Sequence, residues 1–376
     1  MGGASGLNFI SMDGDPGGLI SPREKKQNGS GRSKDKKANS CREKTEIWYV
    51  CCNAEIMEED MAGLEYNAQR VIEEVEKTVV GKKDVLTKIM MAILAGGHIL
   101  IEDIPGTGKT TMALAFSKAM GLRARRVQFT PDVLPADLTG FNIYQKETGK
   151  FVYQPGAVMC NLLLADEINR TSPKTQSALL EVMEEQQVTV DGVTRRTGQP
   201  FIVIATENPA GSAGTQLLPE SQLDRFMICV SMGYPSVEEE MEIMRRSQEE
   251  DRTAAIRPIL DASVLLEMKN EAREIFVHER ICRYIAELAK ATRENSWTEL
   301  GLSPRGTVAL TAMAKACAYL KGRVYVVPAD VEEVFSCVVS HRIILSMKAK
   351  VGHVKTEEVV RRILEEVEKP SLRIRR

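Results

Sequence analysis

The chain of 376 residues is longer than one average domain and fits two domains preceded by a tail. With 43% hydrophobic and 27% charged residues, its composition is that of a globular protein and excludes a fibrous or wholly disordered chain. The formal net charge of −2 gives the whole molecule no electrostatic attraction to nucleic acid or anionic lipid.

Eight cysteines are scattered along the chain without a C-x-x-C pair, and the adjacent Cys51 and Cys52 are too close for zinc-ligand spacing. We interpret all eight as reduced thiols of a cytoplasmic protein. No stretch approaches the ~18 apolar residues that cross a bilayer, and the N-terminus lacks the apolar core of a secretory signal. We therefore expect a protein that is neither exported nor inserted into a membrane.

Residues 1–60 are rich in Gly, Ser, Asn and Lys, and residues 21–44 hold nine basic and three acidic residues. Such a segment buries too little apolar surface to offset the entropy of ordering it. We interpret it as a disordered tail, or as a non-native extension translated upstream of a start at Met57 or Met61. A basic arm that contacts acidic partners is the alternative.

Apolar spacing predicts helices over 64–79 and 85–94, followed by short apolar runs that alternate with helical stretches. This alternation predicts a parallel sheet covered on both faces, with strands at 98–102, 125–129, 161–165, 201–205 and 226–230. Strand signals largely stop beyond Met232. We predict an α/β domain over 62–235 and a helical domain over 236–376, with helices at 262–272, 278–293, 304–320 and 329–339.

The strand at 98–102 continues into the sequence DIPGTGKTT and then into a helix, which is the context of a phosphate-binding loop. Glycines let backbone N–H groups approach phosphate oxygens, and the start of the helix adds its dipole. Lys109 would neutralise phosphates and Thr110 would bind Mg²⁺. The predicted nucleotide-binding residues are Gly106, Thr107, Gly108, Lys109, Thr110 and Thr111. The alternative is an ordinary start of a helix without a ligand.

The strict phosphate-loop pattern begins with Gly, whereas Asp103 stands at that position here. Aspartate tolerates a positive φ better than most other residues, so the turn can still form. A carboxylate close to a triphosphate is nevertheless unfavourable, and its effect on the loop stays open at this point.

The apolar run 161–165 is followed directly by Asp166 and Glu167. Two acids at the end of a buried strand are costly unless they are paired or bind a cation. We expect Asp166 to hold Mg²⁺ and Glu167 to polarise the water that attacks the γ-phosphate. The alternative is that the pair caps the next helix.

Several segments together resemble the MoxR family of AAA+ ATPases: IEDIPGTGKTT, VQFTPDVLPADLTG, NLLLADEINRTSPKTQSALLEVMEEQQVTVDG, FIVIATENPAG, QLDRF and LSPRG. The similarity runs from about Met61 to the C-terminus, and residues 161–192 are its most specific part. It implies an α/β P-loop AAA+ domain with a parallel sheet flanked by helices, followed by a smaller all-helical lid. It also implies ATP and Mg²⁺ as cofactors, and an Asp at the position of Asp103 is compatible with the resemblance.

By this resemblance, three further positions acquire catalytic roles. Asn208 looks like the sensor that helps Glu167 hold the attacking water, although an Asn-Pro turn is the simpler interpretation. Arg225 looks like an arginine finger that reaches the nucleotide of the neighbouring subunit. Arg305 looks like the second sensor, which projects from the lid onto the phosphates; the alternative is a solvated side chain.

Val80 and Gly81 match the segment that packs around the adenine, unless Gly81 merely ends a helix. Two hairpins are predicted over 140–156 and 186–200, with turns at 147–149 and at Asp191–Gly192. In the family, similar hairpins project toward the ring pore or the client; here they could equally be solvated edges.

The resulting hypothesis is a Mg²⁺-dependent ATPase that works as a ring, most simply a hexamer, because its arginine finger must come from a neighbour. By resemblance it would act as a chaperone on a protein client, together with a von Willebrand A domain protein. A nucleic-acid motor is the main alternative, but only 5% of the residues are aromatic. A nucleotide-gated scaffold without hydrolysis is a second, which the intact Glu167 disfavours.

Overall fold

The structure is a computed structural model that describes residues 63–103, 106–207, 218–246 and 256–371. The predicted tail, residues 1–60, lies outside the described residues.

Five strands form a parallel sheet in the order β2-β5-β8-β1-β9. Each strand matches one predicted apolar run: β1 (Ile99–Glu102), β2 (Ala124–Gln128), β5 (Leu162–Asp166), β8 (Ile202–Glu207) and β9 (Ile228–Val230). The order places β8 between β5 and β1. The carboxyl ends of these three strands therefore lie side by side at one edge of the sheet, which is where α/β proteins place their ligands.

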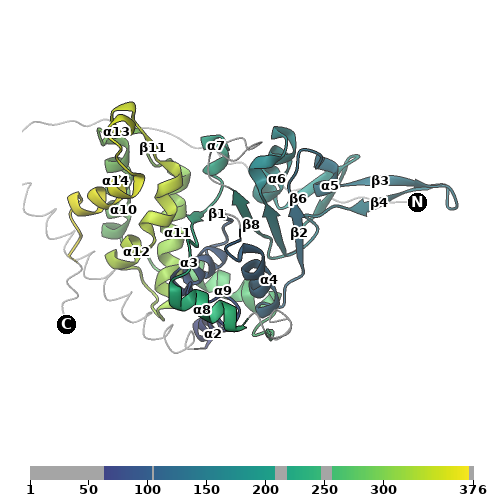
Figure 1. Cartoon of the computed structure of the whole chain (residues 1–376), viewed down its shortest axis with the longest axis horizontal. Coiled ribbons are helices and arrows are strands. Elements are labelled where there is room, and N and C mark those ends of the chain that lie inside the picture. Colours follow the sequence, from purple (N-terminus) through teal and green to yellow (C-terminus); the bar gives the residue numbers. More distant parts are fainter. Residues whose placement is uncertain (1–62, 104–105, 208–217, 247–255, 372–376) are drawn as a thin grey trace, which may run out of the picture. The chain divides into compact units, whose positions relative to one another are not determined.

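Helices cover both faces of this sheet, as predicted (Figure 1). In β8, Ile202 and Ile204 join one core cluster while Val203 and Ala205 join the other, because successive side chains of a strand point to opposite faces. The first cluster includes side chains of α2 (Leu64–Glu76), α3 (Lys83–Leu94) and α4 (Lys109–Ala119), and the second includes side chains of α6 (Pro173–Glu185).

Both predicted hairpins are confirmed. They are formed by β3 (Gly140–Gln145) with β4 (Lys150–Pro155), and by β6 (Gln187–Val190) with β7 (Val193–Arg196). Asp191 and Gly192 have φ values of 50° and 77°, the two positive φ angles of a type I′ turn. The hairpins contact each other, since the Asn142 amide donates to Asp191 Oδ2 at 2.6 Å. The guanidinium of Arg195 also lies 3.9 Å from the ring centroid of Tyr153.

Short elements connect these parts: α5 (Pro135–Thr139), η1 (Ile168–Arg170), α7 (Glu220–Leu223) and α8 (Val237–Arg246). The C-terminal part is helical as predicted, with α9 (Ala262–Glu274), α10 (Glu279–Glu294), α11 (Pro304–Leu320), α12 (Pro328–Val339), η2 (Ser340–Arg342), α13 (Met347–Val351) and α14 (Thr356–Glu366). It also contains a small antiparallel pair that the sequence did not predict, β10 (Thr298–Leu300) with β11 (Ile344–Leu345).

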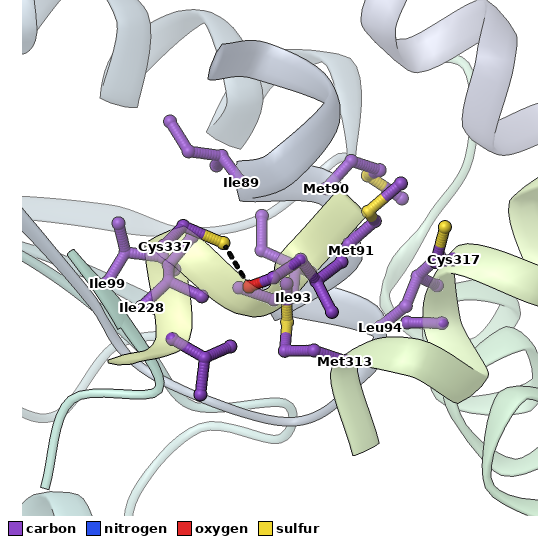
Figure 2. Packing of buried hydrophobic residues seen from close by; sticks show 14 of the residues in the cluster. Ile89, Met90, Met91, Ile93, Leu94, Ile99, Ile228, Met313, Cys317 and Cys337 are labelled. Atoms are coloured by element: carbon purple, nitrogen blue, oxygen red, sulfur yellow. Dashed lines mark hydrogen bonds between the residues drawn. The ribbon is translucent and has the colours of Figure 1, made fainter. Parts of the chain in front are cut away.

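The helical part shares a core with the first face of the sheet, since one buried cluster contains residues of both. Figure 2 shows Ile99 and Ile228, from adjoining strands, beside Cys337 of α12. It also shows Leu94 of α3 near Cys317 of α11. The lid is therefore packed on the sheet through α3, α11 and α12 rather than joined to it by a linker alone.

Five of the eight cysteines lie among the described residues, and all five are free thiols, as predicted: Cys160, Cys229, Cys282, Cys317 and Cys337. In the same part of the chain, none of the helices has the length and apolar character needed to cross a membrane.

Candidate nucleotide-binding site

The predicted phosphate loop joins β1 to α4. Gly106 and Gly108 have φ values of 89° and 83°, which side chains rarely allow. A Cβ at either position would meet nothing within 4 Å, so the loop faces open space. Glycine is thus required by the backbone conformation, and the space beside it is available for a phosphate group at the start of α4.

Asp103 has a structural role that explains the departure from the usual pattern. Its Oδ2 accepts a hydrogen bond from the backbone N–H of Met232 at 3.0 Å, and the side chain is buried. Its backbone oxygen accepts from Lys109 Nζ at 2.9 Å. The carboxylate therefore ties the loop to the segment that follows β9.

Lys109 meets the acidic end of β5, as the sequence predicted. The side chain is only 8% exposed, and this burial lowers the pKa of Lys109, against the opposing effect of the carboxylates of Asp103, Asp166 and Glu167. A partly desolvated ammonium beside acidic groups is a suitable partner for phosphate oxygens. The loop and the acids therefore converge on one place.

Thr110 and Asp166 lie as the proposed Mg²⁺ ligands should. Thr110 Oγ1 donates to Asp166 Oδ2 at 3.4 Å, so a hydroxyl and a carboxylate are adjacent. Among the described residues, no group of three His, Cys, Asp or Glu side chains could hold a metal ion. This donor set fits Mg²⁺, which binds one or two protein oxygens and takes its other ligands from phosphates and water.

Arg126 and Thr206, which the sequence did not single out, hold Asp166. Arg126 Nε donates to Asp166 Oδ2 at 2.9 Å, which puts a cation against the carboxylate. Thr206 Oγ1 donates to Asp166 Oδ1 at 3.0 Å and accepts from the backbone N–H of Glu167 at 2.9 Å. One buried hydroxyl thus fixes both acids. The only sequence signal was a polar residue at the end of an apolar strand.

Glu167 has a left-handed backbone conformation, with φ 56° and ψ 50°. Such a conformation is unfavourable for a non-glycine residue and is typical of functional sites. Its Oε2 accepts from Gln128 Nε2 at 2.8 Å and lies 3.1 Å from Arg170 Nη1. Gln128 was also missed, because it comes from β2, and so was Arg170, although it stands only three residues after Glu167 in η1. The carboxylate is oriented rather than used as a helix cap.

Asn208 lies outside the described residues, so its role as a sensor stays a prediction. The preceding Glu207 is 9% exposed, and its Oε2 has no hydrogen-bond partner among the described residues. Burial and, as a smaller effect, the carboxylate of Glu102 on the adjoining strand together raise the pKa of Glu207 to about 7.

The two arginines singled out by resemblance lie together. Glu184, on the last turn of α6, is 2.8 Å from Arg225 Nη1 through Oε2 and contacts Arg305 Nη2 through Oε1. Among the described residues, neither arginine contacts the phosphate loop, Asp166 or Glu167. The roles of Arg225 and Arg305 as finger and sensor therefore stay predictions.

The backbone of this corner is fixed by Asp224. Its Oδ1 accepts from Arg342 Nε at 2.7 Å, and both carboxylate oxygens accept from Ser303 Oγ, at 3.0 and 2.9 Å. Ser303 also caps α11, two residues before Arg305. Asp224 therefore joins the segment of Arg225 to the lid.

Gly81, which follows Val80, lies directly against α8. Gly81 has a φ of 72°, and a Cβ there would stand 1.8 Å from Glu239 Oε1. The next residue, Lys82, donates to the backbone oxygen of Tyr234 at 3.0 Å. The segment is thus held against the junction of the two domains, and its contact with adenine stays a prediction.

The strand order, the phosphate loop and the paired acids define a P-loop ATPase domain of the AAA class. Residues 98–228 match the family described as "ATPase family associated with various cellular activities (AAA)", and residues 290–363 match the AAA lid domain.

Several known proteins are similar in sequence to this chain. Protein YeaC of Bacillus subtilis is 43% identical over 81% of this chain and 95% of its own length. Chaperone MoxR1 of Mycobacterium tuberculosis is 38% identical, over 84% of this chain and 85% of its own. A crystal structure of a candidate ATPase from Cytophaga hutchinsonii superposes with a TM-score of 0.79 at 38% identity, covering 85% of this chain and 99% of its own. The chain belongs to the MoxR family of AAA+ ATPases.

Proposed function

We propose that the protein binds ATP with Mg²⁺ at the carboxyl edge of the sheet and hydrolyses it to ADP and phosphate. One observation carries this proposal: Lys109, at the start of α4, lies within electrostatic range of the adjacent acids Asp166 and Glu167 at the end of β5, and the next residue, Thr110, donates to Asp166. Beside them, Gly106 and Gly108 face open space that suits a polyphosphate.

Each side chain then has a defined task. Lys109 neutralises the β- and γ-phosphates, while Thr110 and Asp166 hold Mg²⁺, which when bound offsets the charge on the phosphoryl oxygens. Glu167, oriented by Gln128, accepts a hydrogen bond from the attacking water and polarises it. Asn208 would hold the same water from the opposite side.

The arginines complete the site of a neighbouring subunit. Arg225 and Arg305 share Glu184 on α6, at a corner where neither contacts the phosphate loop of its own chain. We infer that both project onto the nucleotide of the next subunit, so that a ring, most simply a hexamer, is the active form. A lone subunit would lack the charge that such a finger supplies, which is worth ~10³–10⁵ in rate in related enzymes.

The cycle would remodel or activate a protein client, in the manner of a chaperone. The joined hairpins support this role, because β3 and β4 expose apolar side chains such as Tyr144 and Phe151, the latter 72% exposed. Tyr144 and Phe151 also contact each other, with ring centroids 5.3 Å apart. Exposed aromatic side chains on a hairpin suit contact with another protein. A von Willebrand A domain protein is the partner that the family resemblance suggests.

The test is ATP turnover by the purified full chain, with and without Mg²⁺, for the wild type and Glu167→Gln. We expect Glu167→Gln to bind ATP normally but to lose at least ~10²-fold in kcat, since the amide cannot polarise water. Glu287→Gln is the matched control, because Glu287 is an exposed acid of α10 that lies outside the groove beside Arg225. Normal hydrolysis by Glu167→Gln would sink the proposal, and strong stimulation by duplex DNA would favour a nucleic-acid motor.

A further inference from the structure

Glu184 is the one side chain that touches both arginines of the corner described above, among the residues that the structure describes. Arg225 follows α7, whereas Arg305 belongs to the first turn of α11, so the two come from different domains. One carboxylate oxygen binds each guanidinium. Glu184 therefore brings the two arginines to one point, which neither segment does alone.

Glu184 uses only one edge of each guanidinium. Arg225 donates through Nη1 both to Glu184 and to the backbone oxygen of Leu180, at 3.1 Å, and Arg305 uses Nη2. Each guanidinium has five N–H donors, so Nε and the other terminal nitrogen remain for a second partner. These remaining donors make no contact with any described residue.

The remaining donors can reach a ligand from outside the chain. The arginine side chains are 33% and 46% exposed. A groove of about 470 Å³ beside Arg225 is lined by Ser177, Leu180, Glu181, Glu184, Glu185, Ser221, Gln222 and Arg225 itself. The carboxylates of Glu181, Glu184 and Glu185 line this groove, so a polyanion is attracted by the two guanidinium groups themselves and not by a net positive charge of the groove. Without Glu184, the two cations would repel each other and separate.

Contacts of Asp224 fix the backbone that carries Arg225 and Arg305. Asp224 binds Ser303 and the buried Arg342, which fixes the backbone on both sides of the corner. What remains adjustable is the direction of the two long side chains, and Glu184 sets that direction.

We propose that Glu184 is a positioning residue, which holds Arg225 and Arg305 together as one composite site for the triphosphate bound to the neighbouring subunit. The inference rests on the proposed ATP hydrolysis in a ring and extends it to a residue of α6. Because α6 continues directly into β6, the same residue stands at the base of the second hairpin. Glu184 touches no nucleotide itself and acts only through the two arginines.

The first test compares Glu184→Gln with Glu287→Gln, the same substitution at an exposed acid of α10 that lies outside the groove. Glutamine keeps the length of the side chain but offers one acceptor oxygen and no charge, so only one arginine stays bound. We expect about a 5-fold lower kcat with an unchanged KM for ATP, since half-exposed ion pairs contribute modestly. Glu287→Gln should match the wild type. An equal kcat in both variants, or a faster Glu184→Gln, would overturn the inference.

The second test uses mixed rings, which separate an effect on the neighbour from a local defect. Arg225→Ala subunits keep their own phosphate loop, and Glu167→Gln subunits keep their arginines, so mixing them should restore hydrolysis. Subunits that carry both Glu167→Gln and Glu184→Gln, mixed with Arg225→Ala subunits in the same way, should restore about 5-fold less hydrolysis. In the presence of ATP, the Glu167→Gln/Glu184→Gln double variant should also show a smaller fraction of assembled rings by sedimentation than the Glu167→Gln variant.

The outcomes separate the two proposals. If the Glu167→Gln variant and the Glu167→Gln/Glu184→Gln double variant restore hydrolysis equally and assemble equally, Glu184 has no positioning role, although the arginines still act on the neighbouring subunit. If Glu167→Gln subunits restore nothing, the assignment of the arginines to a neighbouring site is wrong, and the role of Glu184 is overturned with it.

Discussion

Thr206→Val is the substitution that tests most sharply how the acids are held. The Thr206 side chain is 1% exposed, and its hydroxyl donates to Asp166 Oδ1 while accepting from the N–H of Glu167. Valine has nearly the same shape but can do neither. The substitution therefore removes two buried hydrogen bonds and leaves the packing in place.

The magnitude follows from these two bonds. A hydrogen bond to a charged group is worth about 1.5–3 kcal/mol, and a buried N–H without a partner costs about 1–3 kcal/mol. Asp166 keeps Arg126 and Thr110, which favours the lower end of the first range. We expect Thr206→Val to lower the free energy of unfolding by about 3 kcal/mol.

The assay is urea unfolding of the wild type, Thr206→Val and Thr206→Ser, with ATP turnover measured in parallel. Thr206→Ser keeps the hydroxyl and loses one methyl group, so it should stay within about 1 kcal/mol of the wild type. Thr206→Val should also lose turnover, because Glu167 is no longer held in its left-handed conformation. Equal stability and turnover of the two variants would refute this account of how the acids are positioned.

Two further predictions concern buried charges. Asp224→Asn should lower the free energy of unfolding by about 3 kcal/mol, because the charge of Arg342, whose side chain is 3% exposed, loses its partner. In urea unfolding, the double variant with Arg342→Met should recover part of the lost stability. A cost of Asp224→Asn below about 1 kcal/mol would contradict the prediction. Glu207 has a folded pKa of about 7 against an ordinary value of 4.5, so its contribution to stability is present below pH 4.5 and is lost as the pH rises to 7. Glu207→Gln should therefore be more stable than the wild type at pH 8 by about 3 kcal/mol but similar at pH 4.5, and unfolding curves with the same difference at both pH values would exclude this.

The sheet and most helices could be predicted from sequence, because their signals are local. Buried parallel strands are continuous apolar runs, and α11 begins at Pro304 as predicted, since Ser303 caps it and proline suits the first helical position. The phosphate loop and the acid pair were predicted for the same reason: each is a short motif between a strand and a helix.

The residues that orient these motifs could not be predicted. Arg126 and Gln128 lie on the edge strand β2, where charged and polar side chains look merely solvated. Glu184 is one of several acids on an amphipathic helix, and only the tertiary fold shows which of them meets the arginines. Asp224 stands next to Arg225 in the sequence, whereas its ion-pair partner in the fold is Arg342 of η2, more than a hundred residues away along the chain.

The most direct test of the account is a structure of the assembled Glu167→Gln variant with ATP and Mg²⁺. We predict that Lys109 and Thr110 of one subunit contact the phosphates and metal, and that Arg225 and Arg305 of the next subunit contact the γ-phosphate while still bound to Glu184. A nucleotide bound away from Lys109, or a γ-phosphate without an arginine from the neighbouring subunit, would contradict it.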